Sequence, residues 1–209
     1  MGWMRDATGL DKRAANYVPL TPLSHLQRAA EVFPDVLAVV HGPHRKTYAE
    51  YYDRVTRLAS SLAAMGVRPG DVVATVLPNI PAQAEAHFGV PACGAVLNTI
   101  NTRLDVDTIA YILDHGEAKV VLCDPQFMSV LAEAIELMEG PPPKVIEVAD
   151  PHEGAHAVSD YPEYETVLAS ADPDFTWIMP EDEWESLALN YTSGTTGRPK
   201  GGVYHHRGA

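Results

Sequence analysis

The stretch DVVATVLPNIPAQAEAHFGVPACGAVLNTI, residues 71–100, contains two short apolar runs on either side of a segment of helical length. The first run is Val72–Leu77, which ends at the turn Pro78-Asn79-Ile80-Pro81, and the second is Ala95–Ile100. Short apolar runs bounded by turn residues are typical of buried strands, and a helix between two of them predicts a parallel strand–helix–strand unit. This stretch therefore predicts an α/β fold.

The same alternation continues on both sides of this unit. Upstream, Thr47 and Glu50 fit a capping box, and the helix that they begin carries an apolar face at i, i+3, i+4 and i+7 spacing until Gly66. Thr21-Pro22-Leu23 opens an earlier helix, in which Ser24 and Gln27 fit a second capping box. The other expected elements are a strand at 36–40, a helix at 105–115 with Asp105 as its N-cap, a strand at 119–123, a helix at 125–139 and a strand at 145–148. This order predicts a mostly parallel sheet flanked by helices.

Charge is distributed unevenly along the chain. The 209 residues carry 15 Lys and Arg against 28 Asp and Glu, a formal net charge of −13. Residues 145–190 contain 12 of the acidic residues and no lysine or arginine, whereas residues 191–209 contain Arg198, Lys200 and Arg207 and no acid. A net acidic chain repels a phosphate backbone, which argues against a nucleic-acid partner. The basic end is suited to a small anion.

These patterns divide the chain into four expected parts. A polar leader covers 1–20, an α/β part covers 21–148, and an acidic connector with four prolines covers 149–186. The connector is expected to be a solvated surface segment with one short helix near residues 161–169. The last part, 187–209, is expected to hold a strand, a loop and a second strand.

The cysteines and the apolar runs exclude several classes of protein. Cys93 and Cys123 are too few for a disulfide framework or a cysteine metal site, and their apolar surroundings predict buried reduced thiols. No apolar run is long enough for a signal peptide or a membrane span. The chain is therefore expected to be cytoplasmic and to have no membrane span. The sequence leaves the oligomeric state open, and a homodimer is one of the states it allows.

The most informative stretch is YTSGTTGRPKG, residues 191–201. Its glycines let successive backbone N–H groups turn into one concavity, its hydroxyls add donors, and its lysine adds a point charge suited to phosphate. It is not a Walker A loop, because Arg198-Pro199 separates Gly197 from Lys200, and it lacks the dinucleotide fingerprint. The candidate phosphate-binding residues are Thr192, Ser193, Gly194, Thr195, Thr196, Gly197 and Lys200.

This loop resembles the phosphate-binding signature of the adenylate-forming (AMP-binding) superfamily, which includes acyl-CoA synthetases, peptide-synthetase adenylation domains and luciferases. The segments 47–50, 66–73 and 77–79 are similar to that family's early part. The segments 94–104 and 115–119 look most like those of its fatty-acid–CoA ligase branch. The resemblance covers most of the chain and implies the first part of the large N-terminal domain of such an enzyme.

The resemblance also implies a two-step reaction. A carboxylate attacks the α-phosphorus of ATP to give an acyl adenylate and pyrophosphate, and the thiol of CoA then displaces AMP. ATP, Mg²⁺ and CoA are the implied cofactors, with the loop on the β- and γ-phosphates, Lys200 neutralising charge and the Thr192 hydroxyl reaching Mg²⁺. No catalytic side chain is expected in this chain, because family members are more than twice as long and the adenine and acid sites are expected downstream.

The preferred interpretation is an acyl-CoA synthetase of fatty acid metabolism, most like the medium- or long-chain type, whose 209 residues are inactive alone. One alternative is an amino-acid or aryl-acid adenylation domain. Another, of a different class, is a non-catalytic nucleotide-binding or dimerisation module. Gly202 departs from the family pattern, since a β-branched residue is usual there, and it is expected to weaken the strand after the loop.

Overall fold

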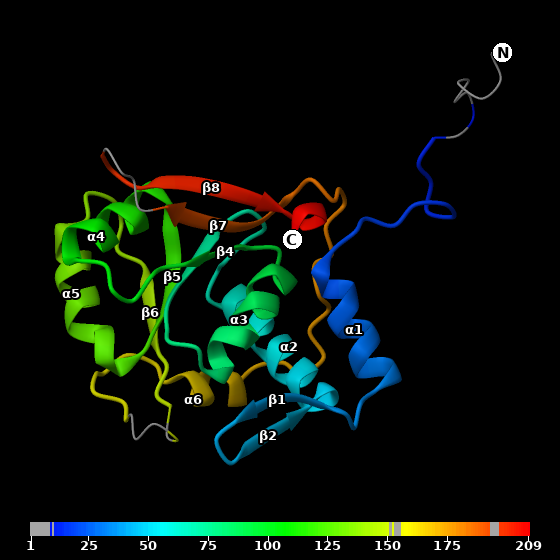
Figure 1. The fold of residues 1–209 in the computed structure, drawn as a ribbon, viewed down its shortest axis with the longest axis horizontal. Helices are drawn as coiled ribbons and strands as arrows, with labels where there is room; N and C mark the ends of the chain where they lie inside the picture. Colours follow the sequence, from blue (N-terminus) through cyan, green and yellow to red (C-terminus); the bar gives the residue numbers. More distant parts are fainter. Residues whose placement is uncertain (1–8, 10, 151, 153–155, 193–196) are drawn as a thin grey trace.

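The fold is a six-stranded sheet with helices on both faces, beside a two-stranded hairpin (Figure 1). The structure is a computed structural model that describes residues 9, 11–150, 152, 156–192 and 197–209. The sheet consists of β3 (Val72–Val76), β4 (Val96–Thr99), β5 (Ala118–Cys123), β6 (Lys144–Glu147), β7 (Ser186–Thr192) and β8 (Lys200–His205), and the hairpin of β1 (Leu37–His41) and β2 (His44–Thr47). The helices are α1 (Pro22–Val32), α2 (Tyr48–Ala64), α3 (Pro81–Ala92), α4 (Val106–His115), α5 (Met128–Leu137) and α6 (Tyr164–Ala169).

The strands of the sheet follow the order β6-β5-β3-β4-β7-β8. The pairs β6–β5, β5–β3, β3–β4 and β4–β7 are parallel, and β8 runs antiparallel to β7 at the edge. The predicted α/β class with a mostly parallel sheet is confirmed. β3 and β4 lie inside the two apolar runs of residues 71–100, and α3 connects them.

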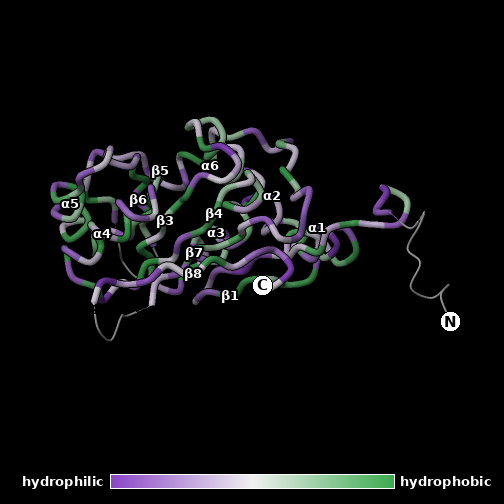
Figure 2. The backbone as a smooth tube through the Cα atoms, turned by 90° about the horizontal axis from the view of Figure 1, so that it is seen from above, coloured by the Kyte–Doolittle hydropathy of each residue, from purple (hydrophilic) through white to green (hydrophobic). Residues whose placement is uncertain are grey.

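The two faces of the sheet bury separate hydrophobic clusters. One cluster packs α1, α2, α3 and α6 against sheet residues that include Val73 and Leu122. The other packs α4 and α5 against sheet residues that include Ala74 and Val121. Successive strand residues point to opposite faces, so neighbours such as Val73 and Ala74 belong to different clusters. The described residues that precede α1, 11–21, run away from this body in both views (Figures 1 and 2).

Side-chain caps determine where α2 and α4 begin. The Glu50 N–H donates to the Thr47 hydroxyl at 3.3 Å, and the Thr47 N–H donates to the Glu50 carboxylate at 2.7 Å, so the predicted capping box is confirmed. The Asp105 carboxylate accepts from the Thr108 N–H at 2.8 Å and caps α4, as predicted. Each cap satisfies a backbone donor that the helix itself leaves free.

Two details of the N-terminal part differ from the prediction. The capping box expected at Ser24 and Gln27 is wrong, because Thr21 is the N-cap of α1 and Pro22, which has no N–H to satisfy, takes the first helical position. The strand expected near residues 36–40 is present as β1, but it pairs with β2, which the sequence did not predict. The residues of β2 are polar and partly exposed, so they carry no apolar strand signal.

The acidic connector contributes to the core as well as to the surface. The short helix expected there is α6, and its Tyr164 is buried. Trp177 is also buried, where its indole N–H donates to the Thr56 hydroxyl of α2 at 2.9 Å. The expected solvated face describes exposed residues such as Glu181 and Asp182 but not these aromatic side chains.

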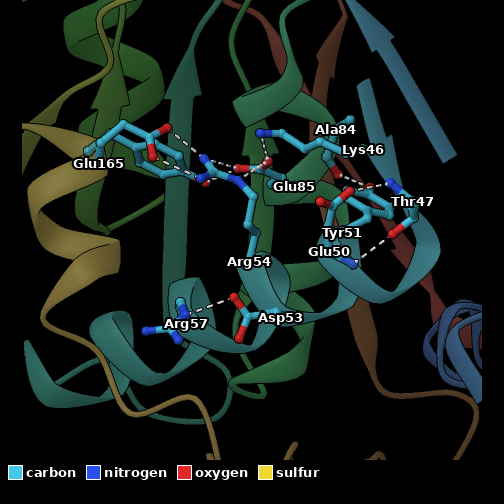
Figure 3. A network of polar contacts seen from close by, with 11 residues as sticks. Lys46, Thr47, Glu50, Tyr51, Asp53, Arg54, Arg57, Ala84, Glu85 and Glu165 are labelled. Carbon is cyan, nitrogen blue, oxygen red and sulfur yellow. Dashed lines mark hydrogen bonds and ion pairs between the residues drawn. The ribbon is translucent and has the colours of Figure 1, made fainter. Parts of the chain in front are cut away.

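A buried carboxylate ties α2, α3 and α6 together (Figure 3). Glu85 of α3 is fully buried, and Arg54 of α2 donates from Nε to Glu85 Oε1 at 2.6 Å. The same guanidinium donates to Glu165 of α6 at 2.6 Å, and the Tyr164 hydroxyl donates to Glu85 at 2.8 Å. Burial opposes ionisation of Glu165, but the Arg54 guanidinium outweighs it and lowers the pKa of that carboxyl. The buried charge of Glu85 is thus paired with Arg54 and hydrogen-bonded to Tyr164.

The structure also shows the state of the two cysteines and the character of the helices, from which the sequence argued against a disulfide framework and a membrane span. Cys93 and Cys123 are buried and free, as predicted. Burial raises the pKa of each thiol to about 12, so both stay protonated near neutral pH. None of the helices in the described part of the chain combines the length and the apolar character that a bilayer crossing needs.

Candidate functional site

The predicted phosphate loop joins β7 to β8, at the carboxyl end of a strand in the parallel part of the sheet (Figure 1). β7 pairs in parallel with β4, with Ala188 opposite Leu97. In open α/β sheets, ligands bind outside the carboxyl ends of the parallel strands. The loop therefore begins at the edge where a ligand of such a sheet is expected.

The pairing of β7 with β8 brings the two ends of the loop together. Thr192 is the last residue of β7, Lys200 is the first of β8, and the two are register partners. Both residues are exposed, and the Cβ position of Gly197 is open, with no heavy atom within 4 Å. The other predicted site residues, Ser193, Gly194, Thr195 and Thr196, lie outside the described residues.

The described end of the hairpin offers a hydroxyl and a positive charge on one side. Directly opposed residues of an antiparallel pair project from the same face, so the Thr192 and Lys200 side chains share a face. Neither Arg198 nor Lys200 forms an ion pair with another described residue. A hydroxyl donor beside a lysine ammonium suits the oxygens of a phosphate.

A cavity of about 380 Å³ lies beside this end of the hairpin. It is lined by Thr99 at the end of β4, by Asn101 and Leu104 after it, and by Thr192 and Pro199 at the two ends of the loop. A larger cavity of about 850 Å³ lies among the beginnings of β3, β5 and β6. That larger cavity contains no predicted site residue and lies at the amino ends of the strands, so the smaller one is the better candidate.

Two residues of α4 that contact the hairpin were missed by sequence reasoning. The Tyr191 hydroxyl lies 2.7 Å from His115 Nδ1, and the Arg198 guanidinium lies 5.1 Å from the centroid of the Tyr111 ring. Burial, and then the neighbouring Tyr111, raise the pKa of Tyr191, so its hydroxyl stays protonated near neutral pH. Tyr111 and His115 are four positions apart on one helix face, which is the signal that could have pointed to them.

The fit of Mg²⁺ depends on how many ligands the protein itself must supply. Within the described residues, no three His, Cys, Asp or Glu side chains lie together as a metal site. Mg²⁺ usually keeps several waters and is held by substrate phosphates together with one or two protein ligands. The single hydroxyl of Thr192, beside the candidate phosphate-binding residue Lys200, would fit an ion held in that way.

Known proteins resemble the chain along nearly its whole length. The family described as AMP-binding enzyme matches residues 26–209. An acetate/butyrate–CoA ligase of Arabidopsis thaliana, AAE7, described as peroxisomal, is 47% identical over 98% of this chain and 38% of that protein. The acetate–CoA ligase CCL3 of Humulus lupulus is 44% identical over 98% of this chain and 38% of that protein. The chain thus spans 38% of the length of these two curated relatives.

Solved structures share the fold. The anthranilate CoA ligase AuaEII, in complex with anthranoyl-AMP, matches with a TM-score of 0.83 and 20% identity, over 94% of this chain and 37% of that one. The inhibitor-bound N-terminal domain of FACL13 from Mycobacterium tuberculosis matches with a TM-score of 0.75 and 30% identity, over 90% of this chain and 44% of that one. At its lower identity, the first match is evidence for the fold alone.

Proposed function

The chain belongs to the AMP-binding enzyme family, and from this premise we propose that it is part of an AMP-forming acid–thiol ligase. In the proposed reaction, a carboxylate attacks the α-phosphorus of ATP, giving an acyl adenylate and pyrophosphate, and the thiol of CoA then displaces AMP. The observation that carries the proposal is the hairpin end at the carboxyl edge of the sheet, where Thr192 and Lys200 are register partners.

The proposed role of the loop is to bind the β- and γ-phosphates. The Lys200 ammonium would neutralise their charge, and the hydroxyls and backbone N–H groups of residues 192–197 would donate to their oxygens. Positioned donors at such a site act mainly by orienting the substrate and by stabilising charge. When bound to the phosphates, Mg²⁺ would neutralise further charge, with the Thr192 hydroxyl as one ligand.

For the acid, we propose a short aliphatic carboxylate in place of the medium- or long-chain fatty acid that the sequence led us to expect. The names of the relatives favour small acids: AAE7 is called an acetate/butyrate–CoA ligase, and a protein of Humulus lupulus that is 42% identical is called a 2-methylpropanoate–CoA ligase. A trans-cinnamate:CoA ligase of Petunia hybrida is also 42% identical, so an aryl acid is the second candidate. CoA is the proposed thiol, because all four relatives are named as CoA ligases.

We also make proposals on the cellular compartment, the oligomeric state and the limits of the domains. A cytoplasmic enzyme was expected, yet AAE7 and the Petunia protein are described as peroxisomal, and imaging of a fluorescent fusion decides between the two compartments. A homodimer is tested by light scattering on the purified protein. The proposed limits at residues 20, 148 and 186 are tested by limited proteolysis.

The proposed activity is tested by ATP–pyrophosphate exchange on the full-length enzyme that contains these residues, with a panel of acids. The panel contains acetate, butyrate, 2-methylpropanoate, octanoate, cinnamate and several amino acids, with Lys200→Ala as the matched control. We expect exchange that depends on a short aliphatic acid and that falls about ten- to a hundredfold in Lys200→Ala, because one charge-assisted contact is lost. Exchange that depends on amino acids supports an adenylation domain instead, and ATP binding without exchange supports a non-catalytic module.

The same assay tests the 209 residues by themselves. We propose that they are inactive alone, since they cover 38% of the length of AAE7 and CCL3. Acid-dependent exchange by these residues, above that of their Lys200→Ala variant, would refute this proposal. It would also place a complete adenylation site within residues 1–209.

A further inference from the structure

α4 contacts the hairpin on both sides of the phosphate loop. Before the loop, the Tyr191 hydroxyl lies 2.7 Å from His115 Nδ1, with the two rings nearly perpendicular at 82°. Near the other end of the loop, two residues before β8, the Arg198 guanidinium lies over the Tyr111 ring. Tyr111 and Tyr191 also meet edge to face, with their centroids 6.5 Å apart. These four side chains form one cluster, which we call the α4 seat (Tyr111, His115, Tyr191 and Arg198).

We infer that Tyr111 and His115 are positioning residues, which hold the two ends of the phosphate loop in the geometry that binds ATP. The inference rests on the proposed function of the loop. Neither residue belongs to the loop motif, and His115 lies 76 positions before Tyr191. The α4 seat would therefore be an additional part of the nucleotide site, contributed by a different element of the fold.

The physical reason is the conformational freedom of a glycine-rich loop. Glycine has more accessible backbone conformations than any other residue, so ordering such a segment around a ligand costs free energy. Contacts that fix both ends before the ligand arrives reduce that cost and raise affinity. Arg198 is suited to this task because Pro199, with its restricted φ, connects it directly to Lys200.

The α4 seat lies at the surface, so its contacts can be removed with little effect on the stability of the fold. His115 and Arg198 are exposed, and Tyr111 and Tyr191 are half-buried. Exposed cation–π pairs and hydrogen bonds contribute little to global stability. Loss of these contacts should therefore change the order of the loop and the affinity for ATP more than the thermal midpoint.

The variants are chosen to distinguish three effects: loss of the Tyr111 ring, loss of the Tyr191 hydroxyl, and replacement of a tyrosine outside the α4 seat. Tyr111→Leu removes the ring under Arg198, whereas Tyr111→Phe keeps it. Tyr191→Phe removes the hydroxyl that faces His115, and Tyr161→Leu, at an exposed tyrosine of the connector, is the matched control. We expect Tyr111→Leu to weaken binding of Mg·ATP about two- to fivefold, from the usual strength of an exposed cation–π pair.

The double variant Tyr111→Leu/Tyr191→Phe should weaken binding of Mg·ATP about tenfold, because it removes one contact on each side of the loop. Tyr111→Phe and Tyr161→Leu should bind as the wild type does, and all thermal midpoints should agree within about 3 °C. Wild-type affinity in the double variant overturns the inference. Equal losses in Tyr111→Phe and Tyr111→Leu overturn it too, since the ring would then be irrelevant.

Hydrogen exchange without nucleotide tests the α4 seat independently of the proposed function. The amides of Thr192, Gly197, Arg198, Lys200 and Gly201 should exchange faster in the double variant than in the wild type and in Tyr111→Phe. Unchanged exchange in the double variant overturns the inference. If exchange rises as expected but the wild-type protein binds no Mg·ATP, the α4 seat holds the loop and it is the proposed function that fails.

Discussion

Two regions of the molecule differ in how tightly their residues are packed. One is the contact between α2 and α3, which we call the α2–α3 face (Arg54, Leu58, Glu85 and Gly89), and the other is the β7–β8 hairpin. On the α2–α3 face, Arg54 pairs with the fully buried Glu85, and a Cβ added at Gly89 would lie 2.6 Å from Leu58 Cδ2. On the hairpin, Lys200 is exposed at the beginning of β8. The difference suggests that substitutions on the α2–α3 face change the free energy of unfolding, whereas substitutions at the end of the hairpin change ligand binding.

The largest effect is expected from Arg54→Met. This change leaves the Glu85 carboxylate buried without its guanidinium partner, so we expect the free energy of unfolding to fall by about 3–5 kcal/mol. Urea denaturation followed by circular dichroism measures the loss. The matched control is Arg57→Met, because Arg57 of the same helix pairs at 2.8 Å with Asp53, whose side chain is 47% exposed, whereas that of Glu85 is 0% exposed.

An i,i+4 ion pair whose carboxylate is half exposed contributes little, so Arg57→Met should cost no more than about 1 kcal/mol. The contrast between the two arginines is the critical result. If Arg54→Met costs no more than Arg57→Met, the buried network does not stabilise the α2–α3 face and the comparison fails.

A smaller loss is expected from Gly89→Ala on α3. The added Cβ would lie 2.6–3.0 Å from three side-chain atoms of the fully buried Leu58. Overpacking costs about 1–3 kcal/mol, and the better helix propensity of alanine returns about 1 kcal/mol, so we expect a net loss of up to about 2 kcal/mol. Thermal denaturation of the purified variant measures it.

A second background makes this prediction sharper. In a Leu58→Ala protein the two nearest obstructing atoms, Cδ2 and Cγ, are gone and only the Cβ atom at 3.0 Å remains, so Gly89→Ala should be clearly less destabilising there than in the wild type. A loss of the same size in both backgrounds would mean that contact with Leu58 is not the cause.

The smallest effect is expected on the hairpin, at two adjacent glycines. A Cβ at Gly202 meets only the Asn190 carbonyl oxygen, at 3.7 Å, whereas one at Gly201 lies 3.0 Å from Leu189 Cδ1. Gly202→Val should therefore stabilise β8 by up to about 1 kcal/mol, through strand propensity, and Gly201→Val should destabilise it. Thermal midpoints of the two variants measure this, and a lower midpoint for Gly202→Val contradicts the account of β8.

The elements that could be predicted from the sequence depend on local interactions. The caps at Thr47 and Asp105 each use a partner three residues away, so both helix starts could be read from spacing alone. β3 and β5 are apolar runs because the sheet is covered on both faces. At α1, two local signals compete, and Thr21 with Pro22 prevails over Ser24.

What could not be predicted depends on partners that are distant in the chain. β2 is polar and is recognisable only by its pairing with β1, and the antiparallel direction of β8 follows from its pairing with β7. Trp177 is buried only because α2 provides the Thr56 hydroxyl and an apolar surface. The candidate site shows the same limit, since the loop motif could be recognised from its sequence and the contacts of Tyr111 and His115 could not.

The central claim is that the end of the hairpin binds phosphate while contributing little to the stability of the fold. The most direct test titrates Mg·ATP into the wild-type protein and into Lys200→Ala by calorimetry, and unfolds the same preparations in urea. We predict that the affinity falls about ten- to a hundredfold, or about 1.5–3 kcal/mol, while the free energy of unfolding changes by less than about 0.5 kcal/mol. Equal affinity of the two proteins for Mg·ATP would contradict the claim.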